Sequence, residues 1–302
     1  MKLKQLLIFL LFLCSCTESK KILPNSTGSN SEIIFVVDDS IWEQQLKKHA
    51  QKVFSSSVPG INRFEASFNL IQINNSQFTS LLRNHKNIII INDSINRIVS
   101  DYFAHDQLVS FVKYVDDTTS FKYDCNKLFK IYYDNEIQIL NSKLSTTTNN
   151  LNSDYINKKF NININITEEY TKTVDSNNLV LFTYNPSGKE VIKHICISSF
   201  DYKENFDFDS IYFNINKLLK TYLIGSRPNS YVILEDKYPI VMYNEFYRGL
   251  WRLQNGFMGG PILIKPIFSG NKIIIITALV FDPSSKKSCL LYTSPSPRDL
   301  RL

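Results

Sequence analysis

The sequence predicts an α+β protein with mixed sheets and packed helices, arranged in two subdomains. Apolar runs of strand length, such as Ile33–Val37 and Ile88–Ile91, occur among segments with helical periodicity. The two kinds of segment do not alternate regularly, which argues against a repeated βαβ array. With 302 residues, 43% of them hydrophobic, the chain is long enough to form two cores.

Residues 1–16 have the features of a bacterial lipoprotein signal peptide. A positively charged start precedes the apolar stretch Leu6–Leu13, which is far shorter than the roughly 20 residues that span a bilayer. Leu13–Cys16 resembles the lipobox, in which a small residue precedes the cysteine that receives lipid. Several acyl chains on Cys16 anchor a protein stably in a membrane. The alternative is an ordinary signal peptide whose cysteines occur by chance.

Residues 17–31 are rich in Ser, Asn, Gly and Pro, a composition typical of a flexible tether. Thr17, where an Asp would favour retention in the inner membrane, resembles an outer-membrane sorting signal. We therefore expect a lipid-anchored protein of the cell envelope, in the outer membrane and facing the periplasm. The membrane is its expected partner through the N-terminal lipid.

Residues 289–302 are not expected to belong to the native protein. Their sequence corresponds to the translation of a sequencing adapter, and the alternative is a natural tail rich in Pro and Ser. The remaining body divides into an N-terminal α/β subdomain at 32–150 and a C-terminal α+β subdomain at 151–288.

In the N-terminal subdomain, Ile33–Val37 and Ile88–Ile91 are expected to be buried strands. Ser40 and Glu43 have the spacing of a capping box, which predicts a helix over residues 41–54. The other expected elements are a short helix from Asn75 or Ser76 to Leu82, a strand at 108–115, and helical segments from 123 to 160 interrupted at 145–150.

In the C-terminal subdomain, strict alternation over Asn161–Ile166 predicts a half-exposed strand. Residues 210–223 have the apolar spacing of a helix. The other expected strands are Leu179–Tyr184, Ile192–Ser198, Tyr231–Leu234, Ile262–Ile264 and Ile273–Val280.

Three carboxylates are the candidates for a metal site. Asp38 and Asp39 follow one buried strand and Asp93 follows another, so the three side chains would meet at one sheet edge if these strands are neighbours. Their oxygen atoms suit a divalent cation. The alternative is that Asp-Ser before a helix is cap chemistry.

No other motif indicates catalysis or a cofactor. The histidines at 49, 85, 105 and 194 lack metal-ligand spacing and are interpreted as surface or core residues. Asn185–Lys189 lacks the upstream glycine of a phosphate loop and is expected to be a hairpin turn. The net charge of +6 is spread without a basic cluster, which argues against nucleic-acid binding. Cys125 and Cys196 would form a disulfide in an oxidising periplasm only if the fold brings them together, and the sequence does not specify their distance.

The segment from Gly249 to Pro261 is the densest signal in the chain. Gly259–Pro261 is expected to form a tight turn. Arg248, Trp251 and Arg252 would form a recognition surface if they are exposed. The alternative places Trp251 in the core beside a bend.

Three segments, Val36–Glu43, Val58–Gly60 and Gly249–Pro261, resemble the Bacteroidetes lipoprotein family known as domain of unknown function 4837. The resemblance extends from about Leu23 to Lys287 and implies a secreted, lipid-anchored envelope protein. It implies no activity and no catalytic residue.

The first hypothesis is accordingly a non-enzymatic envelope lipoprotein that binds a partner protein or a glycan through the Gly249–Pro261 segment. The second is a metal-dependent hydrolase built on Asp38, Asp39 and Asp93, and the third is a purely structural tethered domain.

Overall fold

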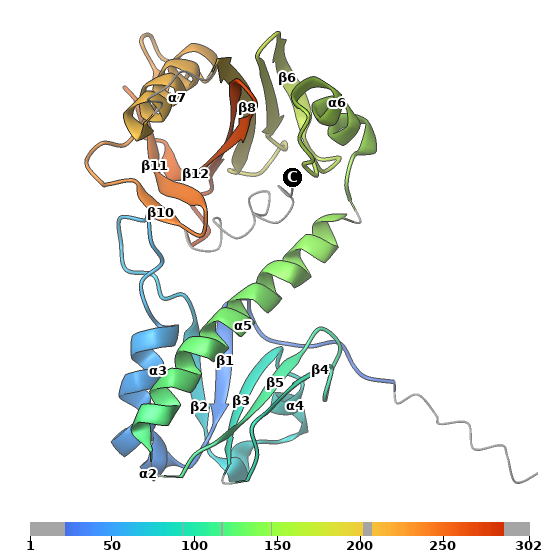
Figure 1. Ribbon diagram of the computed structural model, residues 1–302, viewed down its shortest axis with the longest axis vertical. Helices are drawn as coiled ribbons and strands as arrows, with labels where there is room; N and C mark the ends of the chain where they lie inside the picture. Colours follow the sequence, from blue (N-terminus) through green and yellow to red (C-terminus); the bar gives the residue numbers. More distant parts are fainter. Residues whose placement is uncertain (1–21, 93, 116, 146, 202–206, 287–302) are drawn as a thin grey trace, which may run out of the picture.

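The computed structural model describes residues 22–286 except 93, 116, 146 and 202–206. The described residues form two lobes, one above the other in Figure 1, and each lobe has its own β-sheet. Within these residues the N-terminal sheet has five strands and the C-terminal sheet has eight. Helices pack on both sheets, so the predicted α+β class with two subdomains is confirmed.

The N-terminal lobe is built on a mainly parallel sheet. Its strands are β1 (Glu32–Val36), β2 (Asn69–Ile73), β3 (Asn87–Asn92), β4 (Arg97–Ser100) and β5 (Leu108–Lys113). They lie in the order β2-β1-β3-β5-β4, in which β4 runs antiparallel to β5 and the other pairs are parallel. The central strands are continuous apolar runs because both faces of the sheet are covered.

Helical segments cover the two faces of this sheet. They are α2 (Asp39–Ile41), η2 (Trp42–Leu46), α3 (Lys47–Phe54), η3 (Asn75–Gln77), α4 (Ser80–Arg83) and α5 (Thr118–Ser145). Ile33 and Phe35 of β1 belong to the core under α3 and α5. Ile34 and Val36 point to the opposite face and pack with Phe78.

The helix predicted over residues 41–54 forms, but it begins differently. α2, η2 and α3 follow one another directly, with a π-helical turn in the middle. The N-cap is Asp38 and not Ser40, and it makes no side-chain capping hydrogen bond. Glu43 instead pairs with Lys47, with 2.8 Å between Oε1 and Nζ. The predicted capping box is therefore wrong, because the helix starts earlier in the chain.

The C-terminal lobe is built on an antiparallel sheet. Its strands are β6 (Thr171–Ser176), β7 (Leu179–Tyr184), β8 (Ile192–Asp201), β9 (Tyr231–Leu234), β10 (Val241–Tyr243), β11 (Phe246–Gln254), β12 (Gly259–Ser269) and β13 (Lys272–Phe281). The order is β10-β11-β12-β13-β8-β7-β6, and β9 also pairs with β11. Helices α6 (Asn150–Phe160) and α7 (Phe208–Tyr222) cover opposite faces of the curved sheet (Figure 1). Among the described residues, no helix is both long and apolar enough to cross a membrane.

Three predicted local conformations are wrong. Asn161–Ile166 buries alternate isoleucines but is not a strand, because its last residue accepts a hydrogen bond from Asn149 N–H beside α6 instead of joining the sheet. Gly259–Pro261 does not turn but lies in β12, and the chain reverses earlier, where Asn255 has a φ of 55°. The short helix expected at 75–82 is divided into η3 and α4.

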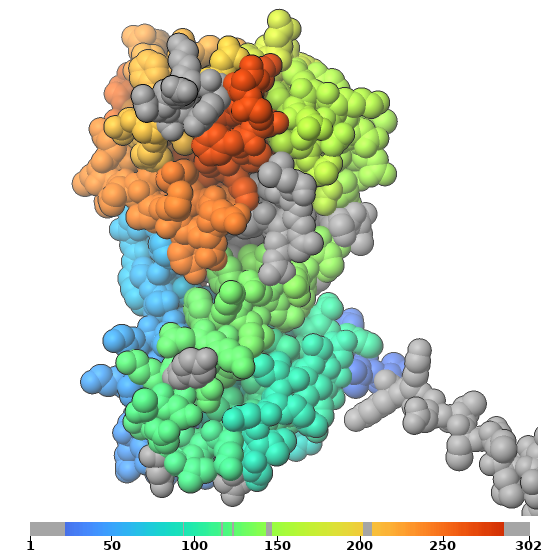
Figure 2. Space-filling model, in the orientation of Figure 1, coloured from blue at the N-terminus to red at the C-terminus, as the bar shows by residue number. Residues whose placement is uncertain are grey.

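Packed side chains join the two lobes in addition to the chain itself. Arg248 on β11 donates a hydrogen bond from Nη2 to the hydroxyl group of Tyr133 on α5 at 3.1 Å. Its guanidinium carbon lies 4.5 Å from the ring centroid of Tyr243. The loop 55–67 of the N-terminal lobe also contacts β11. A Cβ atom added to Gly60 of this loop would lie 2.6 Å from the Cβ of Arg248, so the two chain segments approach closely there. In Figure 2 this loop and α5 fill the waist between the lobes.

Candidate functional site

The predicted carboxylate cluster has only part of the expected geometry. β1 and β3 are parallel neighbours, as the prediction required. However, Asp38 accepts a hydrogen bond from Asn75 Nδ2 at 3.1 Å, and Asp39 accepts one from Gln72 Nε2 at 2.8 Å. Asp93 lies outside the described residues. Within the described part of the chain, no group of three or more His, Cys, Asp or Glu side chains has an arrangement suited to a metal ion.

The recognition surface expected at Arg248, Trp251 and Arg252 is not formed as predicted. Arg248 is only 2% exposed and Trp251 only 5%, because β11 is covered by the lobe junction and by the α7 side of the core. Arg252 is partly exposed, and its Nε lies 3.6 Å from Glu235 Oε2. The alternative interpretation of Trp251 as a core residue is therefore the one that the structure supports.

Cys125 and Cys196 are both free and buried, and they belong to the cores of different lobes. A disulfide between them is therefore excluded in this fold. Cys16 and residues 289–302 lie outside the described residues.

A cavity of about 340 Å³ lies in the C-terminal lobe, between the sheet and the C-terminal end of α7. This volume lies within the range of sites that hold small molecules. The described residues that line it include no Asp, Glu, Lys or Arg. Most of its wall is apolar and comes from β7, β9, β11, β13, the end of α7 and the turn between β11 and β12. The apolar residues include Leu181, Leu223, Val232, Trp251, Met258 and Leu279.

The indole of Trp251 is a fixed part of this wall. Its Nε1 donates a hydrogen bond to the carbonyl oxygen of Val280 at 3.2 Å. Exposed apolar side chains lie at the rim, where Tyr222 is 36% exposed and Ile224 is 71% exposed. An apolar molecule would therefore meet apolar surface both at the opening and inside.

One side of the cavity carries a chain of hydrogen-bonding groups. Thr183 Oγ1 lies 3.0 Å from His194 Nδ1 and 3.1 Å from Thr173 Oγ1. The Thr173 hydroxyl group donates to the carbonyl oxygen of Leu181 at 3.3 Å. Burial lowers the pKa of His194 to about 4, so its imidazole is neutral at pH 7. Its Nε2 has no partner among the described residues, although the side chain lines the cavity.

Sequence reasoning did not single out His194, which was interpreted as an ordinary surface or core histidine. The available signal was the alternation along two neighbouring strands, because Thr183 on β7 lies directly opposite His194 on β8. Only the strand register brings these two residues to one cavity wall, and the sequence does not specify that register.

A second, open hollow of about 430 Å³ surrounds the segment that the sequence highlighted. Its walls include Arg252 and Glu235 of the C-terminal lobe and Asn62 from the loop 55–67. Phe257, at the turn between β11 and β12, is 85% exposed beside it. Within the Gly249–Pro261 segment, the exposed part is therefore the turn between β11 and β12.

The segment 24–31, expected to be part of the flexible tether, is instead fixed along the N-terminal lobe. Its backbone forms β-bridges from Asn25 to His105 and from Thr27 to His85. Backbone hydrogen bonds accompany both bridges. Residues 24–31 are therefore not part of a flexible tether, and residues 17–21 lie outside the described residues.

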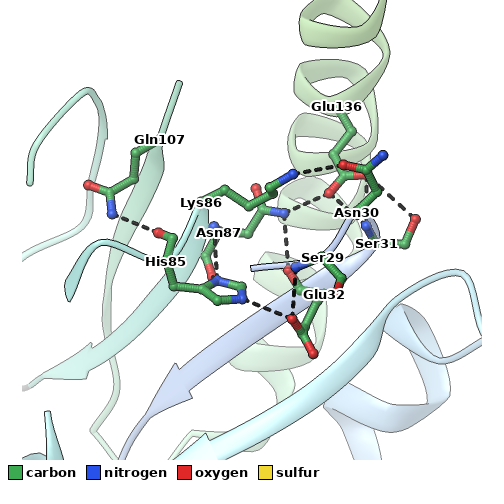
Figure 3. A network of polar contacts seen from close by, with 9 residues as sticks. All are labelled: Ser29, Asn30, Ser31, Glu32, His85, Lys86, Asn87, Gln107 and Glu136. Carbon is green, nitrogen blue, oxygen red and sulfur yellow. Dashed lines mark hydrogen bonds and ion pairs between the residues drawn. The ribbon is translucent and has the colours of Figure 1, made fainter. Parts of the chain in front are cut away.

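Glu136 of α5 lies at the end of this segment, within the polar network of Figure 3. Its two oxygens accept hydrogen bonds from the backbone N–H of Ser31 at 2.8 and 2.9 Å, and Oε1 also accepts one from Asn87 Nδ2 at 2.8 Å. Burial raises the pKa of Glu136, although these hydrogen bonds act in the opposite direction. Nearby, His85 Nε2 lies 3.2 Å from Glu32 Oε2. These hydrogen bonds connect the segment 24–31 to α5 and β3.

The comparisons with known proteins divide the chain at the same place as the two lobes. Residues 26–145 match a family model described as Domain of unknown function (DUF8532), and residues 149–293 match one described as Domain of unknown function (DUF4837). The second resemblance, expected from about Leu23 onward, therefore covers only the C-terminal part. No curated protein and no solved structure matches the chain. One family model thus matches each lobe of the chain.

Proposed function

We propose that this chain is a lipid-anchored, non-enzymatic envelope protein whose C-terminal lobe binds a small, mainly apolar molecule. The observation that carries the proposal is the cavity beside His194, which combines an apolar wall with a few convergent polar groups. That combination is typical of ligand sites, and a titratable group with a shifted pKa, here His194, is a further common feature of them.

The volume limits the size of the ligand. A liquid-like packing of roughly 30 Å³ per non-hydrogen atom allows about ten such atoms in a cavity of 340 Å³. Since no charged side chain of the described residues lines the cavity, the buried part of the ligand is expected to be uncharged. A medium-length amphipathic molecule meets both conditions.

The two tryptophans of the chain allow a direct binding experiment. Trp251 lines the cavity, whereas Trp42 is 5% exposed in the core of the N-terminal lobe. The mature chain with Cys16→Ala keeps every described residue and avoids the detergent that a lipidated protein requires. In this background, Trp42→Phe leaves Trp251 as the reporter, and Trp251→Phe leaves Trp42 as the matched control.

The probe is 8-bromooctan-1-ol, because bromine quenches indole fluorescence at short range. We expect saturable quenching of Trp251 and no saturable quenching of Trp42. Equal, non-saturating quenching of the two reporters would contradict ligand binding in the cavity.

Support for the anchor comes from the lipobox at Leu13–Cys16 and from the fixed position of residues 24–31. Residues 17–23 extend to at most about 25 Å, so a lipid on Cys16 would keep the protein close to the membrane surface. We place it in the outer membrane, facing the periplasm. Labelling with radioactive palmitate tests the anchor: the wild-type chain should incorporate the label, and Cys16→Ala should not.

A second candidate function is the binding of an envelope protein or a glycan at the hollow around Arg252. The 85% exposure of Phe257 favours it, because large exposed aromatic side chains are frequent anchors of interfaces. Phe257→Ala should abolish co-purification of such a partner without lowering the stability of the fold. The matched control is Phe268→Ala, because Phe268 is 59% exposed and lies at the far end of β12. Equal co-purification by both variants and the wild type would argue against the second candidate.

A further inference from the structure

We infer that the cavity of the C-terminal lobe selects a ligand whose uncharged head group donates a hydrogen bond to Nε2 of His194, as an alcohol does. The inference rests on the proposed binding function and adds the chemical class of the ligand. It predicts weaker binding of amphipathic molecules whose head group can only accept hydrogen bonds, such as ethers and ionised carboxylates.

The direction of each hydrogen bond follows from counting hydrogens. A threonine hydroxyl group has a single hydrogen to donate. The hydrogen of Thr173 goes to the carbonyl oxygen of Leu181. In the contact of 3.1 Å between the two hydroxyl groups, Thr183 is therefore the donor and Thr173 the acceptor.

The same count determines the tautomer of His194. Because the hydrogen of Thr183 is already used, the contact of 3.0 Å between Thr183 Oγ1 and His194 Nδ1 requires an N–H donor on Nδ1. The neutral imidazole then carries no hydrogen on Nε2, which is a lone-pair acceptor. This atom has no partner among the described residues, so a ligand that enters the cavity can satisfy it by donating a hydrogen bond.

The lack of positive charge around Nε2 adds to the preference for an uncharged head group. The imidazole is neutral at pH 7, so it offers no positive charge to a carboxylate. The described lining residues contribute no Lys or Arg that would do so instead. A carboxylate beside Nε2 would bring two lone pairs together in an apolar site, whereas a hydroxyl group would form one hydrogen bond there.

Two isomeric probes test the inference. 1-Octanol and 1-methoxyheptane have the same atoms and similar length, but only the alcohol donates a hydrogen bond. Octanoate provides the charged head group. Each competes at pH 7 with 8-bromooctan-1-ol, and recovery of Trp251 fluorescence in the Cys16→Ala, Trp42→Phe chain reports displacement.

The alcohol should bind about tenfold to a hundredfold more tightly than the ether, because the ether displaces water from Nε2 and offers it no donor in return. Octanoate should bind at least as weakly as the ether. His194→Phe should abolish the preference for the alcohol while all three probes still displace the bromoalcohol weakly. His49→Phe, in the N-terminal lobe, is the matched control and should keep the preference.

Equal affinities of octanol and methoxyheptane for the wild-type cavity would overturn the inference, and so would tighter binding of octanoate. These results would leave the proposed function intact, whereas displacement by none of the probes would contradict the proposed function itself. If circular dichroism shows that His194→Phe is unfolded, Thr183→Val replaces it. The Thr183→Val substitution removes the acceptor of the His194 Nδ1 hydrogen and so allows the tautomer with its hydrogen on Nε2. It should therefore reduce the preference for the alcohol at least about tenfold.

Discussion

The indole Nε1 of Trp251 donates its hydrogen bond to the same Val280 carbonyl oxygen that prevents a side chain at Gly260. The donor–acceptor distance is 3.2 Å, and an ideal Cβ on Gly260 would lie 2.0 Å from that oxygen. Because Gly260 of β12 has no side chain, the Val280 carbonyl oxygen of β13 can accept the hydrogen bond that fixes the indole of Trp251 in the cavity wall. This relationship gives the glycine a role that does not depend on a turn.

Gly260→Ala should therefore destabilise the C-terminal lobe and weaken ligand binding. A Cβ cannot share space with a backbone oxygen, so the two strands must separate, and we expect a loss of about 3 kcal/mol in the free energy of unfolding. Gly188→Ala is the control, since its Cβ would meet open space and its φ of +78° costs only about 1 kcal/mol. Urea unfolding measures both, and equal losses would contradict the explanation.

Tyr133→Phe should loosen the junction of the lobes. The Tyr133 hydroxyl group accepts the hydrogen bond of the buried Arg248, and its removal leaves a buried cation with one partner fewer, which costs about 1.5–3 kcal/mol. Tyr247→Phe removes a hydroxyl group that has no partner among the described residues and should change the free energy of unfolding by less than about 0.5 kcal/mol. A Tyr133→Phe protein as stable as Tyr247→Phe would contradict this role.

Glu136→Gln should remove one source of pH dependence. Burial raises the folded-state pKa of Glu136 above 4.5, so the folded protein holds a proton that the unfolded chain releases. The contribution of Glu136 to stability is then greatest below pH 4.5 and falls as the pH rises through the folded-state pKa. The wild type should thus lose stability relative to Glu136→Gln over this window in urea unfolding. A difference that is constant with pH, or that changes in the wild type's favour, would show that the pKa is not raised.

The thiols of Cys125 and Cys196 should be inert in the folded protein. Burial raises the pKa of each to about 12, so only about one ten-thousandth of either group is a thiolate at pH 8. Iodoacetamide followed by peptide mass spectrometry should find both unmodified in the native protein and modified after unfolding in urea. Rapid native labelling of either cysteine would mean that its lobe opens readily.

Much of the fold was predictable from local patterns. Ile33–Val37 and Ile88–Ile91 are strands because unbroken apolar runs suit a parallel sheet covered on both faces. The Asn185–Lys189 hairpin turn was also predictable, and it has Gly188 at a positive φ. By contrast, Asn161–Ile166 has the alternation of a strand, but it packs its isoleucines beside α6 without a neighbouring strand. Periodicity reports which side chains are buried and not which backbone groups pair.

The candidate site depends on contacts that the sequence does not contain. Thr183 and His194 meet through strand register, and Trp251 becomes a cavity wall only because α7 covers that face of the sheet. Arg248 was predicted to belong to a recognition surface if exposed, yet it is buried at a junction with Tyr133, 115 residues away. Such long-range contacts follow from topology.

Anomalous diffraction at the bromine edge, from crystals of the mature Cys16→Ala chain soaked with 8-bromooctan-1-ol, tests the central claim most directly. The account predicts a bromine peak inside the cavity between Trp251 and Leu223, with the hydroxyl oxygen within hydrogen-bond distance of His194 Nε2. A saturating soak that leaves the cavity without a peak, or that places bromine only beside Phe257, would contradict it.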